Sequence, residues 1–138
     1  MINNLSEYFL QEQKFYLNQI TYTKLDKCET AEKHTLNCAD SIEVEVNENV
    51  GVKIIVTRSL YFEPEKLFKL SISFGAELLF EPKMKDAYKW NEINMADEFK
   101  MHGGFVTDHL MARISLLISE ITASYGQQPI ILPPNIAK

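Results

Sequence analysis

Strict alternation of apolar and polar residues between Phe68 and Phe80 constrains the fold more than any other feature of this sequence. Every even position is apolar, and most odd positions carry Lys, Ser, Gly or Glu. A period of two residues places alternate side chains on opposite faces of a β-strand. The stretch therefore predicts a strand of an antiparallel sheet, with one covered face and one face in contact with water.

Two hairpins are predicted around this strand. Residues 51–60 are rich in β-branched side chains, and residues 41–46 alternate between apolar and polar. The turns that join these strands are expected at Asn47–Asn49 and at Glu63–Glu65, which contains a proline. Residues 26–40 show no sustained period, so we expect a long connection there, of the kind that is functional or mobile.

The first predicted strand, Phe15–Leu25, changes the parity of its apolar residues partway along. Leu17 is at an odd position and Ile20 at an even one, so a regular strand would place them on opposite faces. A β-bulge adds one residue and returns the later side chains to the first face. We expect a bulge near Asn18 or Gln19.

Apolar residues recur at intervals of three and four between Phe105 and Tyr125, which predicts a long amphipathic helix. Thr107 or Asp108 stands at its N-cap position and Gly126 at its C′ position. The apolar arc is broader than one sheet face requires, which favours a partner helix or subunit. We therefore assign the following residues to an oligomer interface: Leu110, Met111, Ile114, Leu117, Ile118 and Ile121.

Strands followed by helices, without regular alternation of the two, are typical of an α+β domain. A chain of 138 residues supports one hydrophobic core, so we expect a single domain. Its predicted parts are a short helix or arm over 1–13, the antiparallel sheet over 14–80, a helical region over 81–126 and an extended tail over 127–138. The helical region includes a short helix near Met95–Met101, and three prolines keep the tail from being helical.

Composition excludes several classes of protein. The chain is 46% hydrophobic and has a formal net charge of −5, which disfavours nucleic-acid binding because that depends on Lys and Arg. No basic and apolar leader begins the sequence, and no apolar run approaches the roughly 20 residues of a membrane helix. We expect a cytoplasmic protein without membrane insertion.

No recognisable catalytic motif is present, so we expect neither an enzyme nor a cofactor. His102, Asp108 and His109 could form an acid-base or metal set in a small hydrolase, but exposed histidines and acidic residues around a helix start are the favoured explanation.

The two cysteines are expected to be free thiols. Cys28, His34 and Cys38 are three soft ligands in one connection, whereas structural zinc needs four, so no metal site is predicted.

The order of these features resembles the SecB export-chaperone family. Phe15–Lys24 is similar to that family's opening strand, which has an F-x-I/L-x-x-I pattern followed by Y-T-K. The Met95-Ala96 pair, the Ala112-Arg113 step, and the segment from Tyr125 through Pro129–Asn135 resemble its helices and helix-connecting loop. Together these segments cover most of residues 14–135.

The resemblance implies a four-stranded antiparallel sheet with helices on one face, assembled as a dimer of dimers. Family members bind unfolded preproteins in apolar grooves without ATP and keep them competent for export. Related SecB-like proteins instead guard toxin-antitoxin components, so a dedicated chaperone or adaptor with one partner is the alternative. Unfolded chains expose apolar segments, which an apolar groove with free strand edges can bind. The client-binding residues predicted here are Leu36, Tyr125, Ile130, Ile131 and Leu132.

Two departures from the family pattern bear on function. The family's second helix has no counterpart before Lys138, so either a more open groove or a different assembly is expected. The family's acidic residues for docking the SecA motor lie late in the first strand. Asp26 and Glu29 are the possible equivalents, and the register there leaves a SecA interaction open.

Overall fold

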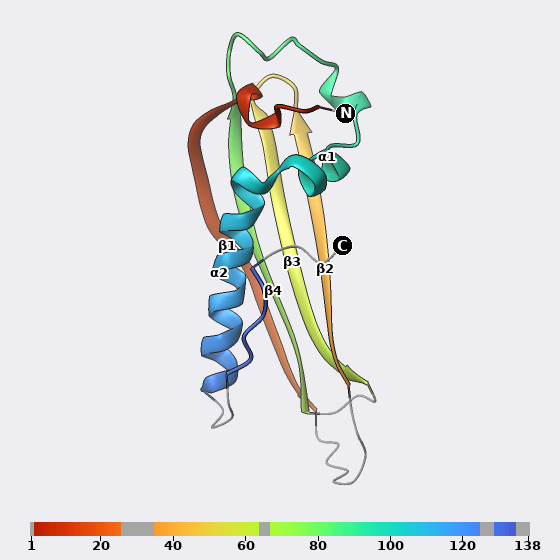
Figure 1. The fold of residues 1–138 in the computed structure, drawn as a ribbon, viewed down its shortest axis with the longest axis vertical. Coiled ribbons are helices and arrows are strands. Elements are labelled where there is room, and N and C mark those ends of the chain that lie inside the picture. Colours follow the sequence, from red (N-terminus) through yellow and green to blue (C-terminus); the bar gives the residue numbers. More distant parts are fainter. Residues whose placement is uncertain (1, 26–34, 64–66, 125–128, 135–138) are drawn as a thin grey trace.

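The computed structural model describes residues 2–25, 35–63, 67–124 and 129–134 (Figure 1). Its strands are β1 (Phe9–Leu25), β2 (Thr35–Asn47), β3 (Gly51–Glu63) and β4 (Leu67–Phe80). Its helices are the 3₁₀ helices η1 (Leu5–Tyr8) and η2 (Trp90–Glu92) and the α-helices α1 (Met95–His102) and α2 (Gly104–Ala123).

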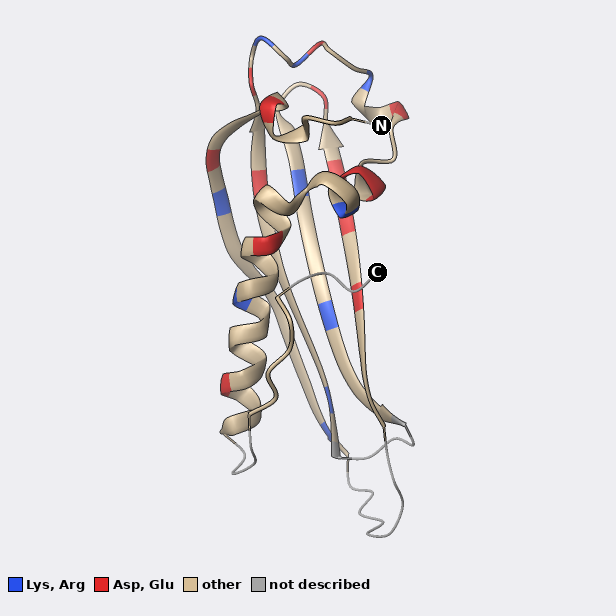
Figure 2. Ribbon diagram, viewed as in Figure 1, with Lys and Arg blue, Asp and Glu red and all other residues tan. Residues whose placement is uncertain are grey.

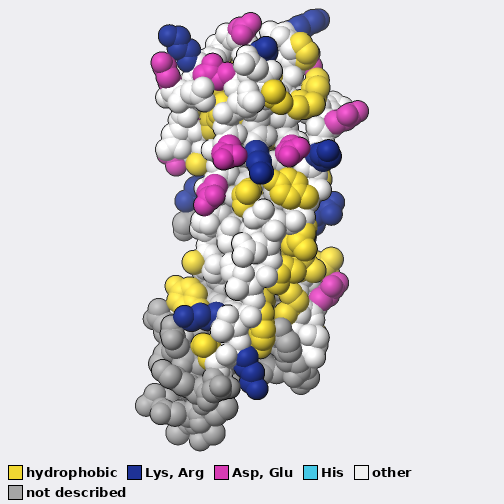
Figure 3. All heavy atoms as spheres, turned by 180° about the vertical axis from the view of Figure 1, so that it is seen from behind, with side chains coloured by type: hydrophobic (Ala, Val, Ile, Leu, Met, Phe, Trp, Pro, Cys, Tyr) yellow, Lys and Arg dark blue, Asp and Glu magenta, His cyan; other side chains and the backbone are white. Residues whose placement is uncertain are grey.

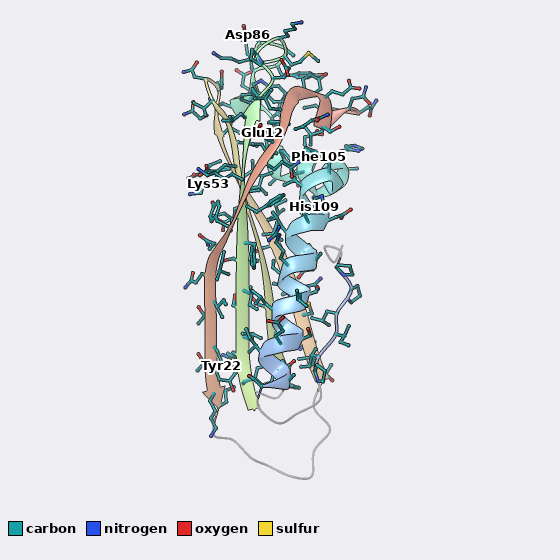
Figure 4. The ribbon with its side chains drawn as sticks, turned by 90° about the vertical axis from the view of Figure 1, so that its left-hand side faces the viewer. Glu12, Tyr22, Lys53, Asp86, Phe105 and His109 are labelled. Carbon is teal, nitrogen blue, oxygen red and sulfur yellow. The ribbon has the colours of Figure 1, made fainter. Side chains whose placement is uncertain are left out.

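The four strands form one antiparallel sheet in the order β1-β4-β3-β2, so β1 and β2 are its edges. α2 runs along one face of the sheet, and α1 and η1 lie towards one end (Figure 1). The side view shows α2 on one side of the sheet only (Figure 4). We call the face covered by α2 the inner face and the opposite one the outer face. The predicted α+β architecture, with helices packed on one face, is confirmed.

The alternation that predicted β4 is confirmed by its burial. The apolar residues at the even positions of β4 are all buried on the inner face. The outer face is not uniformly in contact with water, because Ser73 and Gly75 are also buried. Tyr16 lies across Gly75, where an added Cβ atom would come within 2.3 Å of the ring. Asn18 donates a hydrogen bond to Ser73 Oγ at 3.0 Å, so the side chains of Tyr16 and Asn18 on β1 cover Gly75 and Ser73 on the outer face.

The predicted bulge in β1 is confirmed at Asn18. Leu17 is opposite Phe74 and Gln19 is opposite Ser73, so one extra residue lies between these pairs. Leu17 and Ile20 therefore share the inner face. The turn predicted at Asn47–Asn49 is also confirmed, by a hydrogen bond of 2.9 Å from the Val50 amide to the Asn47 carbonyl. The turn predicted at Glu63–Glu65 falls mostly outside the described residues.

Both edge strands are longer than the sequence pattern indicated. β1 begins at Phe9, whereas an arm or short helix was predicted as far as residue 13; only η1 is helical there. A second register shift between Phe9 and Gln13 disrupts the alternation, which hides this part of the strand. β2 begins at Thr35, so residues 35–40 are strand and not connection. Asp40 interrupts their apolar pattern because it pairs with a charged residue of β3.

The two α-helices meet at Gly103, whose amide donates to the Phe99 carbonyl at 2.8 Å. The prediction of α1 is confirmed, and the Asn94 side chain caps it by accepting from the Asp97 amide at 3.2 Å. The predicted N-cap of α2 is wrong, because Gly103 holds that position. Thr107 lies one turn inside the helix, and its hydroxyl donates to the Gly103 carbonyl. Gly126 lies outside the described residues.

Candidate functional site

α2 uses most of its broad apolar arc to pack on its own sheet. Leu110, Met111, Ile114 and Ile118 are fully buried in the core. We therefore correct their assignment to an interface between subunits, because in this structure they hold α2 against β4 and β3. Leu117 and Ile121 are half-buried against the core. Among the large apolar side chains of α2, the most exposed is Leu116, at 60%.

Residues Pro129–Pro134 form a segment without regular secondary structure, which we call the strap. It returns beside α2 over the inner face of the sheet (Figure 1). Ile130 and Leu132 are half-buried against the core, whereas Ile131 is 80% exposed. The Ile130 amide donates to Thr122 Oγ1 of α2 at 2.8 Å, which fixes the start of the strap.

Arg58 of β3 fixes the other end of the strap. Its side chain and that of Asp40 on β2 are only 2% and 0% exposed. Arg58 Nε and Nη2 donate to the two carboxylate oxygens of Asp40, at 2.7 and 2.8 Å. Arg58 Nη1 donates to the Pro133 carbonyl at 2.8 Å and to Ser115 Oγ of α2 at 3.2 Å. The hydrogen bonds with Asp40 are the main cause of a raised pKa of Arg58, which stays charged.

Sequence reasoning did not identify this ion pair. Arg58 and Asp40 each occupy a position where the alternation of β3 or β2 would place an apolar residue on the inner face. The signal available in the sequence was an acidic residue that would continue the alternation of the predicted strand 41–46 by one step, opposite a basic residue on the next strand. The same reasoning could not find Thr122 or Ser115, because their role depends on the path of the strap.

Leu36 was expected in the long connection over residues 26–40, but it lies on β2. It is opposite Phe62 and is half-buried. Its neighbours at alternate positions also face the inner side and are half-buried against the core. These residues form what we call the β2 surface: Leu36, Cys38, Ile42, Val44 and Val46. Tyr125, the remaining predicted client-binding residue, lies outside the described residues.

The opposite edge of the sheet carries a second apolar surface. Leu17, Ile20 and Tyr22 share the inner side of β1 and are 50%, 40% and 38% exposed. Seen from behind, hydrophobic side chains follow the β1 side of the molecule in a strip (Figure 3). We call these three residues the β1 edge. Because β1 is an edge strand, the backbone groups on the side away from β4 have no neighbouring strand within the described sheet.

Charge is unevenly distributed around these surfaces. Acidic and basic residues gather at the end of the molecule that carries α1 and η2, and they are sparse along most of α2 (Figure 2). The strap contains no charged residue. An apolar ligand on the inner face would therefore displace few charged groups from water.

Two hollows open on the outer face of the sheet. One, of about 460 Å³, lies near the β2–β3 turn and includes Lys53 and Glu77 in its walls. The other, of about 360 Å³, is lined by Thr21, Ser59 and Ser71 among others. Of the predicted client-binding residues that the structure describes, none lines either hollow.

The residues considered for an enzyme or metal site differ in position and exposure. Asp108 and His109 are exposed near the start of α2, where Figure 4 labels His109. The centroid of the His109 ring lies 5.8 Å from that of Phe15. His102 is half-buried at the end of α1. Within the described residues, no group of three or more His, Cys, Asp or Glu side chains could hold a metal ion. Cys28 and His34 lie outside that part of the chain.

Cys38 is a free thiol within the β2 surface. Burial is the main cause of a raised pKa for this thiol, and the neighbouring Asp40 carboxylate adds to the shift. At neutral pH the side chain is therefore a neutral, weakly polar group, suited to apolar contact.

Neither described α-helix combines the length and hydropathy that crossing a membrane requires.

Comparison with known proteins bears on this arrangement. No protein-family model and no curated protein matches the sequence. Among solved structures, the SecB-like chaperone Rv1957 of Mycobacterium tuberculosis aligns with a TM-score of 0.67 and 12% sequence identity. The alignment covers 94% of this chain and 93% of that one. The chain has a SecB-like fold.

At this identity the likeness concerns the fold. Rv1957 was solved in complex with a ChAD peptide from the Rv1956 HigA1 antitoxin. A protein of unknown function from Streptococcus agalactiae is 15% identical over 88% of this chain and 97% of its own, but its TM-score is only 0.43.

Proposed function

We propose that this protein is an ATP-independent chaperone of the SecB type that binds extended, non-native polypeptide segments. The observation that carries the proposal is the β2 surface, a line of apolar side chains left half-exposed on the inner face of an edge strand. The SecB-like fold supports it, as does the uncharged strap, which adjoins this surface at Arg58 and Asp40.

The physical basis is the burial of apolar area by a partner that is itself apolar and extended. Unfolded chains expose such segments, and their removal from water drives association without a fixed sequence. The backbone of an edge strand can also pair with an added strand. Both features act without nucleotide hydrolysis.

Suppression of aggregation tests this function. The purified protein is expected to delay light scattering by a denatured client at a near-stoichiometric ratio, in the absence of ATP. Ile42→Ser should weaken client binding about fivefold, since completing the burial of half an aliphatic side chain contributes about 1 kcal/mol. Glu43→Ser is the matched control, because Glu43 is exposed on the outer face of the same strand.

Cys38 reports whether the client covers the β2 surface. In a Cys28→Ser background, a bound client should slow the alkylation of Cys38. Failure of the intact protein to delay aggregation at any tested ratio would contradict the proposed function. Delay without protection of Cys38 would place the client elsewhere on the molecule.

A dedicated chaperone with one partner is the second candidate function. It is favoured by the structural neighbour, which was solved with a peptide from a single antitoxin. Identification of the polypeptides that co-purify with this protein separates the two candidates. Many unrelated chains are expected for a generalist, and one dominant protein for a dedicated chaperone.

Preprotein export, SecA docking and a cytoplasmic location stay predictions from the sequence. Asp26 and Glu29, the residues considered for SecA docking, lie outside the described residues. Binding of purified SecA to this protein, measured by calorimetry, would test the docking prediction directly.

Self-association through the β1 edge is part of the same proposal. Apolar side chains on an unpaired edge strand favour association with a second copy. Light scattering is expected to give a dimer or tetramer, and Ile20→Lys should reduce the mass to that of a monomer. Thr21→Lys is the control, because Thr21 lies next to Ile20 but faces the outer side. A monomeric wild-type protein at micromolar concentration would contradict this prediction.

A further inference from the structure

The strap lies on the inner face as an extended peptide would lie on a binding surface. Ile130 and Leu132 are turned towards the core, and Ile131 between them is 80% exposed. This alternation is that of an extended chain with one side against a surface. The hydrogen bonds that hold its two ends go to the side chains of Thr122, Ser115 and Arg58.

Arg58 gives this surface a fixed donor for a main-chain carbonyl. The bidentate contact with Asp40 holds two of the guanidinium nitrogens, which orients Nη1 towards the Pro133 carbonyl. A guanidinium held in this way is preorganised, so little side-chain freedom is lost when a carbonyl binds. Every polypeptide carries such a carbonyl, and recognition at this point is therefore independent of sequence.

Apolar contacts of only two half-buried side chains hold the strap against the core. Its two inward-facing side chains are half-buried, and Pro129, Pro133 and Pro134 have no amide hydrogen to donate. Another extended segment with apolar residues two apart, and a carbonyl one residue later, could make the same contacts.

We propose that the strap is an internal occupant of the client-binding surface, and that an extended apolar segment of a client displaces it. The inference rests on the proposed function and deepens it. The displaced position adjoins the ion pair of β2 and β3, so a client there would continue onto the β2 surface. Arg58 Nη1 then donates its hydrogen bond to a carbonyl oxygen of the client in place of that of Pro133.

The test weakens the strap in the full-length protein by Ile130→Ser combined with Leu132→Ser. The probe is a reduced and carboxymethylated, permanently unfolded protein carrying a fluorophore, and binding is followed by fluorescence anisotropy. We expect about tenfold tighter binding, because apparent affinity rises with the fraction of molecules whose site is open. Ile131→Ser is the control and should keep wild-type affinity, since Ile131 is largely exposed. Circular dichroism verifies that both variants keep the fold.

Hydrogen exchange at the Ile130 amide gives a second readout in the wild-type protein. This amide is bonded to Thr122, so displacement of the strap should speed its exchange when the probe binds. Weaker probe binding by the double variant, with slower exchange at Ile130, would overturn the inference and make the strap a direct contact of the client. Unchanged affinity with unchanged exchange would also overturn it. Absence of probe binding by wild type and variants alike would overturn the proposed function as well.

Discussion

Arg58→Met is expected to destabilise the protein by about 3–5 kcal/mol, the cost of leaving one partner of a buried ion pair without the other. The Asp40 side chain is fully buried and receives two hydrogen bonds from Arg58, at 2.7 and 2.8 Å. Removing the guanidinium leaves that carboxylate without its counter-charge. Urea unfolding followed by circular dichroism at fixed protein concentration measures the change.

The matched control replaces both partners. Arg58→Met combined with Asp40→Leu should recover most of the lost stability, because apolar residues of similar size often replace a buried ion pair at little cost. The double variant also lacks the donor to the Pro133 carbonyl. The stability of the double variant therefore distinguishes the contribution of the ion pair from that of the hydrogen bond that attaches the strap. A loss below about 1 kcal/mol for the single variant would mean that the Asp40 carboxylate reaches water.

Ile118→Ala is expected to cost about 2–5 kcal/mol, because truncation of a fully buried aliphatic side chain removes apolar burial and leaves a cavity. Ile118 faces the sheet from α2 and is 0% exposed. The same urea titration measures this loss, and light scattering follows the mass of the protein in parallel. The mass should stay unchanged, since Ile118 belongs to the core and not to a subunit contact.

Leu116→Ala is the control on the same helix. Leu116 is largely exposed, so its truncation should change the free energy of unfolding by less than about 0.5 kcal/mol. If Ile118→Ala instead changed the mass while leaving stability intact, the helix would be an interface, as its broad apolar arc first indicated. Both variants must be compared at one protomer concentration, because self-association adds to apparent stability.

Much of the fold was predictable because it depends on local periods. The two-residue period of β4 and the three-to-four-residue period of α2 each follow from backbone geometry. The change of parity between Leu17 and Ile20 predicted a bulge near Asn18 or Gln19, because residues of one strand that pack on the same covered face must keep the same parity. The structure places the extra residue at Asn18. Predictions that depended on one local cap were weaker, because Gly103, and not Thr107 or Asp108, is the N-cap of α2.

The candidate site was predicted less well than the fold. Ile130 and Leu132 were identified as apolar, but their half-buried packing within the chain was not foreseen. The start of β2 was missed because a charged residue at Asp40 breaks its apolar pattern. That charge makes sense only beside Arg58, eighteen residues later and on the neighbouring strand.

The sequence by itself determined the elements, their order and the amount of apolar side chain available, because periodicity and composition are properties of the chain. Only the tertiary structure decided which of those apolar side chains are buried inside the molecule and which stay accessible to a partner. Burial depends on what lies opposite a side chain, and the opposing groups come from distant positions. α2 covers the middle of the sheet and the strap lies beside it, so the β2 surface and the β1 edge are left half-exposed.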